Sequence, residues 1–449
     1  MTTLSIGLIG LGAMGLNLAR NLTGKGYVVV ALDADANARE RARADGLQVA
    51  DDAAALVAQL NPPRRVLLMV PAGDAVDQVL AAAAPHLQAG DVVVDLGNSH
   101  PHDSERRMSD SKTFGFLGVG MSGGLPGARH GGALMAGGDE AYYQAVAGLL
   151  QAMAATVDGE PCAEWLGPGG AGHFTKTVHN GIEYAEMQAI TEARLLLRGA
   201  LGMPDPEVAE VLRDWASDGD GSFLLSATID ILSRRDPASG TPVLDSVADR
   251  AGEKGTGRWC VAQALDLGVP VPSIAAAVFA RALSASRPDR NETPRPAIDR
   301  HLSIDGIRST FVLSRHAAFA QGFQLLNRAA DDHGWPGNLA AVARLWRAGS
   351  ILQGAAVEAW WRTLGTTPEP WQALATIADR DRAAMTQVLA TGLPLPVMAA
   401  SAQFLAALDA SELGADLLQA QRDYFGGHGL AATDGGALFI DWHGKGDDA

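Results

Sequence analysis

Five polar side chains occupy one face of a helix expected to begin near Gly172. Their spacing is i, i+3, i+4, i+7 and i+8, which places them together on a helical surface. Such a stripe is normally apolar, whereas this one presents an amine, an imidazole, an amide, a carboxylate and a phenol. An amine and a carboxyl group on one face can act as general base and general acid toward a bound molecule. The residues are Lys176, His179, Asn180, Glu183 and Tyr184.

A solvated helix face is the alternative interpretation of this stripe, because charged helix faces are usually only surface. Lys176 and Glu183 would then form an i, i+7 charge pair. Glycines surround the segment, and it lies between the strand-rich and the helical regions of the sequence, which favours a reaction surface instead. We therefore interpret this helix face as a reaction surface.

A glycine-rich turn follows the strand-like run LSIGLIG and precedes the helix-like segment NLARNL. Gly10 and Gly12 allow a tight turn and a close approach to a ligand, and Gly15 lets the helix pack on the strand. The N-terminus of that helix favours an anion such as a pyrophosphate. A purely structural turn is the alternative, but the strand-to-helix setting favours dinucleotide binding. The predicted cofactor loop comprises Gly10, Gly12, Ala13, Met14 and Gly15.

The second strand-like run, YVVVALD, ends at Asp33, about 20 residues beyond the glycines. A carboxylate there can accept hydrogen bonds from the ribose hydroxyls of NAD, and it would repel the 2′-phosphate of NADP. We therefore predict NAD as the preferred cofactor, with NADP as the alternative. In that alternative, Asp33 caps the next helix, and Arg39 or Arg41 holds the phosphate.

Short apolar runs alternate with helix-like stretches at the start of the chain, a pattern typical of a mostly parallel sheet wound by helices. After GPGGAGHF the sequence becomes rich in Ala and Leu, and its apolar residues follow helical periodicity. We predict an α/β Rossmann-like domain over residues 1–171, a large all-α domain over 172–426 and a C-terminal tail over 427–449. The strand-like runs are LSIGLIG, YVVVALD, RVLLMVP, DVVVDLG, FGFLGVG and GALMAGG.

Composition narrows the class of function. The chain has 449 residues, 47% hydrophobic and 19% charged, so it can bury more than one core. The formal net charge of −16 would repel nucleic acid and anionic membranes, which favours small-molecule chemistry. No apolar run approaches the ~20 residues that a membrane-spanning helix needs, and no cluster of metal ligands stands out. With only Cys162 and Cys260 and no secretory pattern, we expect a cytoplasmic protein without disulfides.

The segment GAGHFTKTVHNGIEYAEMQ resembles the signature of the decarboxylating 6-phosphogluconate dehydrogenase family. Other segments resemble that family in the expected order and span nearly the whole chain. The resemblance implies oxidation of 6-phosphogluconate to ribulose 5-phosphate and carbon dioxide while NAD or NADP is reduced. These segments are DLGNSHPHDSERR, GVGMSGGLPGAR, AGEKGTGRW, AVFARALS and LLQAQRDYFGGHG.

The resemblance implies the catalytic roles. Lys176 would be the base that takes the hydroxyl proton and then the acid that polarises the carbonyl as carbon dioxide leaves. Glu183 would donate a proton to C1 of the enediol. Burial would have to lower the pKa of Lys176, because a free lysine is charged at neutral pH. The lysine would replace a metal as the electrophile, so we expect no metal.

The resemblance also assigns binding residues. Lys254, Thr256, Arg281 and Tyr184 would hold the substrate phosphate. Arg422 and His428 would complete that site from the neighbouring subunit, which implies a homodimer with shared active sites formed by the all-α domain. Val70 and Asn98 would contact the cofactor. The sugar acid would be held by Asn98, Ser122, Gly123, Gly124, His179 and Asn180.

The chain departs from the family pattern at three places. Leu125-Pro126 replaces a common acidic pair, Asp33-Ala34-Asp35 replaces an Asn-Arg-Thr-like cofactor segment, and the tail FIDWHGKGDDA is short. The second departure fits a switch to NAD.

Two other functions compete. One is a β-hydroxyacid dehydrogenase for an unphosphorylated acid such as 3-hydroxyisobutyrate, against which the cations at 254, 281 and 422 argue. The other is a dinucleotide-binding sensor that has lost its chemistry, against which Lys176 and Glu183 argue.

Overall fold

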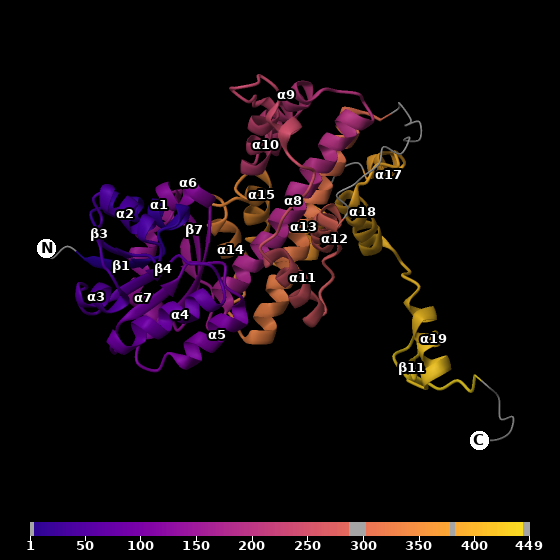
Figure 1. Cartoon of the computed structure of the whole chain (residues 1–449). Coiled ribbons are helices and arrows are strands. Elements are labelled where there is room, and N and C mark those ends of the chain that lie inside the picture. The colour runs from indigo at the N-terminus through magenta and orange to yellow at the C-terminus, as the bar shows by residue number, and fades with distance from the viewer. Residues whose placement is uncertain (1–3, 287–301, 378–381, 443–449) are drawn as a thin grey trace. The chain divides into compact units, whose positions relative to one another are not determined.

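The computed structural model describes residues 4–286, 302–377 and 382–442. The chain divides into two compact units, Met1–Ala402 and Gln403–Ala449, and each is described by itself. The first unit begins with an α/β part and continues as a bundle of helices (Figure 1).

An eight-stranded sheet forms the centre of the α/β part, in the order β10-β7-β6-β5-β4-β1-β2-β3. Neighbouring strands are parallel except β6 and β7, which are antiparallel. The strand order reverses between β1 and β4, and open sheets of this kind bind ligands beyond the carboxyl ends of the strands at such a point. The sheet strands are β1 Ser5–Ile9, β2 Val28–Leu32, β3 Gln48–Val49, β4 Arg65–Leu68, β5 Val92–Asp95, β6 Gly115–Ser122, β7 Ala133–Gly138 and β10 Ala163–Trp165.

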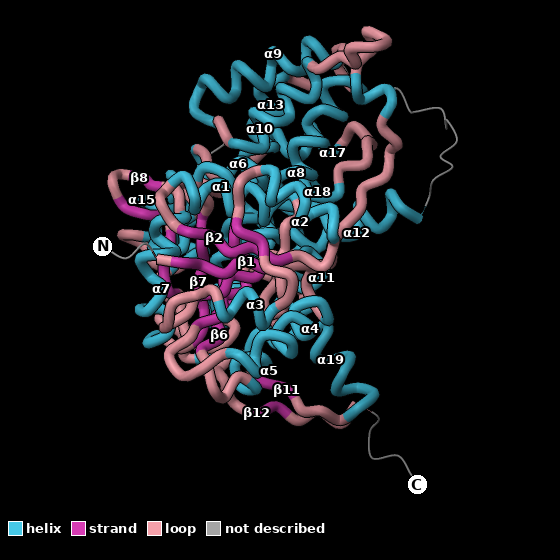
Figure 2. The backbone as a smooth tube through the Cα atoms, turned by 60° about the vertical axis from the view of Figure 1, so that its left-hand side comes forward, coloured by secondary structure: helices cyan, strands magenta, loops and turns pink. Residues whose placement is uncertain are grey.

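Helices cover both faces of this sheet (Figure 2). Alternate side chains of each strand point to opposite faces, so Leu67 packs in one core and Val66 and Leu68 in the other. Such two-sided burial explains why the strands are continuous apolar runs. The helices of this part are α1 Ala13–Gly24, α2 Ala36–Ala44, α3 Ala53–Ala58, α4 Asp74–Ala83, α5 Pro101–Asp110, α6 Gly124–His130 and α7 Glu140–Met153, and a short hairpin pairs β8 Thr156–Val157 with β9 Glu160–Pro161.

Two long helices, α8 Ala171–Gly199 and α13 Ile304–His333, pack side by side in the helical part (Figure 1). Most residues of both helices are buried, because other helices surround them. The remaining helices are α9 Asp205–Trp215, α10 Phe223–Ser233, α11 Thr256–Asp266, α12 Pro272–Ser286, α14 Leu339–Leu345, α15 Ala355–Leu364, α16 Pro370–Ile377, α17 Ala383–Leu389 and α18 Pro396–Asp409.

Glycines on β6 let α8 lie almost against the sheet. A Cβ added at Gly120 would overlap the side chain of Lys176, and a Cβ at Gly118 would lie 2.7 Å from Nδ1 of His173. Any larger residue at either position would therefore push the first turns of α8 away from the sheet. The strand pattern FGFLGVG thus fixes where Lys176 sits.

The second unit contains α19 Ala415–Gly426 and a small antiparallel hairpin of β11 Leu430–Ala431 and β12 Ala437–Leu438. Asp423 joins the helix to the tail, because its carboxylate accepts hydrogen bonds from Gly429 N at 2.6 Å and from Trp442 Nε1 at 2.8 Å. The described part of the predicted C-terminal tail, residues 427–442, therefore folds back on α19.

The predicted fold class, an α/β Rossmann-like part followed by a largely helical part, is confirmed. All six predicted strand-like runs form strands of the sheet, and β3 and β10 are additional. The boundaries at 171/172 and 426/427 stay predictions. Among the residues that the structure describes, no helix is long and apolar enough to cross a membrane.

Candidate active site

The glycine loop between β1 and α1 has the shape that a dinucleotide requires. Gly10 has a φ of +102°, and a Cβ there would overlap the backbone of Met69. A Cβ at Gly15 would overlap the carbonyl oxygen of Gly10, whereas one at Gly12 meets nothing within 4 Å. The N-cap of α1, Gly12, has no side-chain cap, so the first-turn N–H groups around Ala13 and Met14 are left open. This open helix N-terminus fits a pyrophosphate.

Asp33, just after β2, braces this loop. Its carboxylate accepts hydrogen bonds from Leu11 N at 2.5 Å and Asp35 N at 2.8 Å. The helix cap of α2 is Asp35, which accepts from Asn37 N at 3.0 Å, so the alternative in which Asp33 caps that helix is wrong. Arg39 lies close by, and its Nη1 donates to the carbonyl of Asp33 at 2.7 Å.

Two further predicted cofactor contacts lie at the same edge of the sheet. Val70 follows β4, and its Cγ1 would lie 2.9 Å from a Cβ at Gly10. Asn98 follows β5 and is exposed between the buried Gly97 and Ser99. Because β1, β4 and β5 are parallel neighbours, their carboxyl ends bring these positions together with the glycine loop.

The predicted reaction face of α8 is buried against the sheet. Lys176 is 6% exposed and His179 0%. The Lys176 amine lies 3.3 Å from Nδ1 of His179, and Oε2 of Glu183 lies 3.7 Å from the same nitrogen. Asn180 Oδ1 also lies 3.3 Å from that nitrogen, so the four side chains form one cluster. The solvated-face alternative is therefore wrong.

Burial shifts the acidities in this cluster. Loss of solvation lowers the pKa of Lys176 to about 8, against the opposing pull of the Glu183 carboxylate. Burial raises the pKa of Glu183, while Lys176 and Arg281 oppose that shift. Burial also holds the pKa of His179 well below its ordinary value, so this ring is neutral. The lysine can thus be neutral or charged near neutral pH, as a base that later becomes an acid must be.

Ser122, the last residue of β6, joins the cluster through its hydroxyl, which lies 2.9 Å from Nε2 of His179. Gly123 and Gly124 follow with φ values of +107° and +57° and begin α6. A Cβ at Gly123 would lie 2.5 Å from the carbonyl oxygen of Gly349. The Leu125-Pro126 departure falls in the first turn of α6.

Ser350 belongs to this cluster and was not predicted. Its hydroxyl lies 2.9 Å from Nε2 of His179, and the neighbouring Ile351 N–H donates to the Ser122 hydroxyl at 3.1 Å. The loop that carries it follows α14. No motif in the sequence singles out this serine, because only the tertiary fold brings it to a residue so distant along the chain.

The predicted phosphate contacts meet where α8, α11 and α12 pack together. The Arg281 guanidinium stacks on the Tyr184 ring, 3.6 Å from its centroid. Thr256 is buried in the first turn of α11, and the exposed Lys254 lies in the loop just before it. That loop is tied to α12, because Arg281 Nη1 donates to the carbonyl of Gly252 at 3.3 Å.

Arg422 and His428 lie in the second unit. The Arg422 side chain is exposed on α19 and donates to Gln419 at 2.9 Å, and His428 follows the C-terminus of that helix. In the part of the chain that the structure describes, no group of three or more His, Cys, Asp or Glu residues could hold a metal ion.

Comparison with known proteins gives the family. The NAD binding domain of 6-phosphogluconate dehydrogenase matches residues 5–167, and the C-terminal domain of the same enzyme matches residues 172–442. The Candida albicans 6-phosphogluconate dehydrogenase, decarboxylating, is 38% identical, with 99% of this chain and 93% of that protein covered. The Bacillus subtilis NADP(+)-dependent, decarboxylating 6-phosphogluconate dehydrogenase is 35% identical, with 98% and 99% covered.

A solved structure extends this likeness to three dimensions. The Plasmodium falciparum 6-phosphogluconate dehydrogenase, described in apo form and in complexes with its cofactor NADP+ and its substrate 6-phosphogluconate, has a TM-score of 0.87. The match has 29% sequence identity and covers 98% of this chain and 100% of that one. Both domains of that enzyme are matched, and relatives that cover nearly the whole chain share its name, so this chain belongs to the 6-phosphogluconate dehydrogenase family of decarboxylating oxidoreductases.

Proposed function

We propose that this enzyme oxidises 6-phosphogluconate, releases carbon dioxide and forms ribulose 5-phosphate, with Lys176 and Glu183 as its proton carriers. The observation that supports these roles is the buried Lys176 amine, whose pKa burial lowers to about 8, on one helix face with His179 and Glu183. An amine can accept a hydroxyl proton near neutral pH only if a fraction of it is unprotonated at that pH.

The residues act in sequence. Neutral Lys176 takes the proton of the C3 hydroxyl, and the dinucleotide held by the glycine loop would supply the hydride acceptor for C3. The resulting ammonium group donates its proton to the C3 keto oxygen as the C1–C2 bond breaks, so the electron pair left by the departing carbon dioxide forms the C2=C3 double bond of the enediol. Glu183, whose pKa burial raises, then donates its proton to C1 of the enediol, while neutral Lys176 takes the enediol hydroxyl proton and the ketone of ribulose 5-phosphate forms. His179 holds the lysine, and Asn180, Ser122, Gly123, Gly124 and Asn98 hold the sugar acid.

The substrate phosphate is proposed to bind Lys254, Thr256, Tyr184 and Arg281. Replacing Arg281 with Met should raise the KM for 6-phosphogluconate about 10- to 100-fold, the worth of a charge-assisted hydrogen bond. Arg258→Met is the matched control, since this exposed arginine on α11 pairs with Glu253. An unchanged KM in Arg281→Met, or turnover of an unphosphorylated hydroxyacid that equals that of 6-phosphogluconate, would favour the β-hydroxyacid dehydrogenase alternative.

We also propose a homodimer in which Arg422 and His428 complete the phosphate site of the partner. Large apolar side chains exposed on α12, Phe279 at 68% and Leu283 at 60%, and on α19, Phe425 at 75%, support an assembly that covers them. Mixing inactive Lys176→Met and Arg422→Ala chains should restore about a quarter of wild-type activity, because each mixed dimer then has one intact site. If Arg422 serves its own chain, mixing restores nothing.

We propose NAD as the preferred cofactor, because the Asp33 carboxylate stands at the end of β2. The relatives from B. subtilis and P. falciparum use NADP+ by their names, and Arg39 beside Asp33 offers a cation for that cofactor. The ratio of kcat/KM values for NAD and NADP decides between them. Asp33→Asn keeps one oxygen for Leu11 N and should shift this ratio toward NADP, whereas Arg39→Ala should lower only the NADP value.

The decisive experiment follows nicotinamide reduction at 340 nm with purified protein and 6-phosphogluconate while released carbon dioxide is trapped. Equal amounts of reduced cofactor and carbon dioxide are expected. No reduction with either cofactor would contradict the proposal and favour the sensor alternative. The cytoplasmic location and the domain boundaries are not addressed by this experiment and stay predictions.

A further inference from the structure

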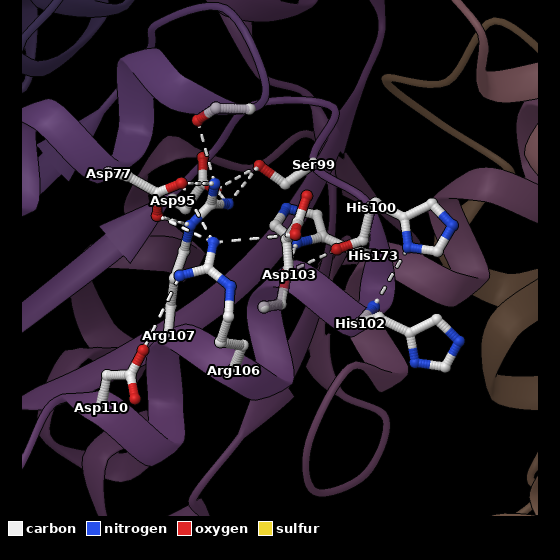
Figure 3. Close-up of polar contacts among 12 residues, drawn as sticks. Asp77, Asp95, Ser99, His100, His102, Asp103, Arg106, Arg107, Asp110 and His173 are labelled. Carbon is white, nitrogen blue, oxygen red and sulfur yellow. Dashed lines mark hydrogen bonds and ion pairs between the residues drawn. The ribbon is translucent and has the colours of Figure 1, made fainter.

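A buried arginine of α5, Arg107, joins two loops at the edge of the sheet (Figure 3). Its side chain is 1% exposed. Its Nε donates to Asp77 at 2.8 Å, its Nη1 donates to the Ser99 hydroxyl at 3.2 Å and lies 3.8 Å from Asp95, and its Nη2 donates to the carbonyl of Gly73 at 3.0 Å. One guanidinium is thus shared by four groups.

These groups come from two different loops. Gly73 ends the loop after β4, which carries Val70, and Asp77 lies in the first turn of α4 that follows. Asp95 and Ser99 border the loop after β5, which carries Asn98. Arg107 therefore fixes the spacing between the loop proposed to face the cofactor and the loop proposed to face both cofactor and substrate.

The Asp95 carboxylate clamps the second loop around Asn98. It accepts hydrogen bonds from the Gly97 N–H at 2.9 Å and from the Ser99 hydroxyl at 2.6 Å. Asp95 is 0% and Ser99 2% exposed, while Asn98 between the two anchors is exposed. Within the described residues, the Asn98 amide makes no hydrogen bond, so the clamp presents it outward to whatever binds there.

A second contact ties α5 to the catalytic helix. The Ser104 hydroxyl lies 2.6 Å from Nδ1 of His173, and both side chains are buried. His173 precedes Lys176 by one helical turn on α8. The clamped loop and the turn of α8 that precedes Lys176 are thus both tied to α5 by side-chain hydrogen bonds.

We propose that Arg107, Asp95 and Ser99 are positioning residues that hold the Asn98 amide at a set distance from Lys176 and from the cofactor loop during hydride transfer. This inference rests on the proposed roles of Asn98 and Lys176. A guanidinium suits the task because its planar fork donates to several acceptors at once, which a lysine cannot do. Burying the charges of Arg107 and Asp95 costs desolvation free energy, so we infer that these residues serve to fix the geometry of the loops rather than to stabilise the fold.

Asp91, the residue immediately before β5, supplies a matched control. Its side chain is 0% exposed, like that of Asp95, and it pairs with Arg64 at 3.1 Å. It also accepts hydrogen bonds from Arg64 N at 2.6 Å and Gln88 N at 2.9 Å. Asp91 lies at the amino end of the strand, away from the cofactor edge, so its loss should affect stability without affecting the placement of Asn98.

The experiment compares Asp95→Asn with Asp91→Asn in the full-length enzyme with 6-phosphogluconate. Both should lower the melting temperature, but only Asp95→Asn should lower kcat/KM, by about 100-fold, because small misplacements of reacting groups cost that much. Its primary deuterium isotope effect with substrate deuterated at C3 should rise, since hydride transfer becomes slower than other steps. Equal kinetic losses in the two variants, with unchanged isotope effects, would overturn the proposal.

A milder pair serves if Asp95→Asn does not fold. Ser99→Ala removes the hydroxyl and should lower kcat/KM at least tenfold, whereas Ser99→Thr keeps the hydroxyl and should restore most of it. Wild-type kinetics in Ser99→Ala would refute a positioning role. If the wild-type enzyme does not turn over 6-phosphogluconate, the proposed function fails rather than the positioning role, because no variant can then be compared with an active enzyme.

Discussion

The Nζ atom of Lys176 lies 3.3 Å from Nδ1 of His179, one turn further along α8. Nδ1 lies at the same 3.3 Å from Oδ1 of Asn180, an atom that only accepts, so the lysine and the amide compete for this nitrogen. The other ring nitrogen lies 2.9 Å from the hydroxyls of Ser122 and Ser350, which can each donate or accept. The ring therefore links the Lys176 amine to the residues Ser122 and Ser350.

Replacing Lys176 with Met should abolish the base while keeping a side chain of similar length. We expect kcat to fall at least about 100-fold, the lower end of what general acid–base catalysis supplies. Dinucleotide affinity, measured by the fluorescence of bound reduced cofactor, should stay near the wild-type value, because the glycine loop is untouched. Retention of more than a tenth of the wild-type kcat would contradict the assignment of Lys176 as the base.

The pH dependence of kcat/KM should show the titration of this lysine. Its pKa is lowered to about 8, and the oxidation needs the neutral amine, so kcat/KM should rise as pH increases and level off above about 8. The measurement is the initial rate at low 6-phosphogluconate from pH 6 to 9.5. An unshifted lysine would instead give a rate still rising at pH 9.5, which would show that burial does not lower the pKa.

Gly12→Ala should separate cofactor binding from folding. A Cβ at Gly12 meets no protein atom within 4 Å, so the melting temperature of the variant should match the wild type. The same Cβ points into the space where a pyrophosphate would approach the α1 N-terminus, so the Kd for the dinucleotide should rise at least tenfold. Gly148→Ala on α7, also without a neighbour within 4 Å, is the matched control and should bind normally. Normal dinucleotide binding by Gly12→Ala would place the cofactor elsewhere.

How much the sequence predicts depends on how local each signal is. The strands β1, β2 and β4–β7 were predictable because burial on both faces demands apolar runs, whereas β10, with Glu164 and Trp165 among its three residues, carries no such pattern. The polar stripe of α8 was predictable because helical spacing alone places its members together.

Contacts between distant segments were not predictable from residue spacing. Ser350 reaches His179 only because the loop after α14 packs against Gly123 and Ser122, which no local pattern signals. The hydrogen bonds of Arg107 to the loops after β4 and β5 likewise depend on the parallel pairing of these two strands. Asp33 was correctly placed at a strand end, but its role as a brace for the glycine loop needed the register between β1 and β2.

A last prediction concerns Glu192, a buried carboxyl group of α8 that holds the start of α18. Its two oxygens accept hydrogen bonds from Val397 N at 2.9 Å and Met398 N at 2.8 Å, and Gln188 donates to it at 3.1 Å. Burial nevertheless raises the pKa of Glu192 to about 7, because desolvation outweighs these donors. The folded chain therefore binds a proton at this site between pH 4.5 and about 7, where the unfolded chain does not.

Stability should consequently fall as pH rises through that window, since the folded state binds more protons there. Glu192→Gln removes this titration, so the free energy of unfolding of the wild type should decline relative to that of the variant by on the order of 3 kcal/mol between pH 4.5 and 7.5. Urea unfolding of both proteins at several pH values measures the difference, with the exposed Glu207→Gln as the control. Parallel stability curves for wild type and Glu192→Gln would mean that Glu192 is ionised throughout and that the donors from α18 outweigh the cost of burying its charge.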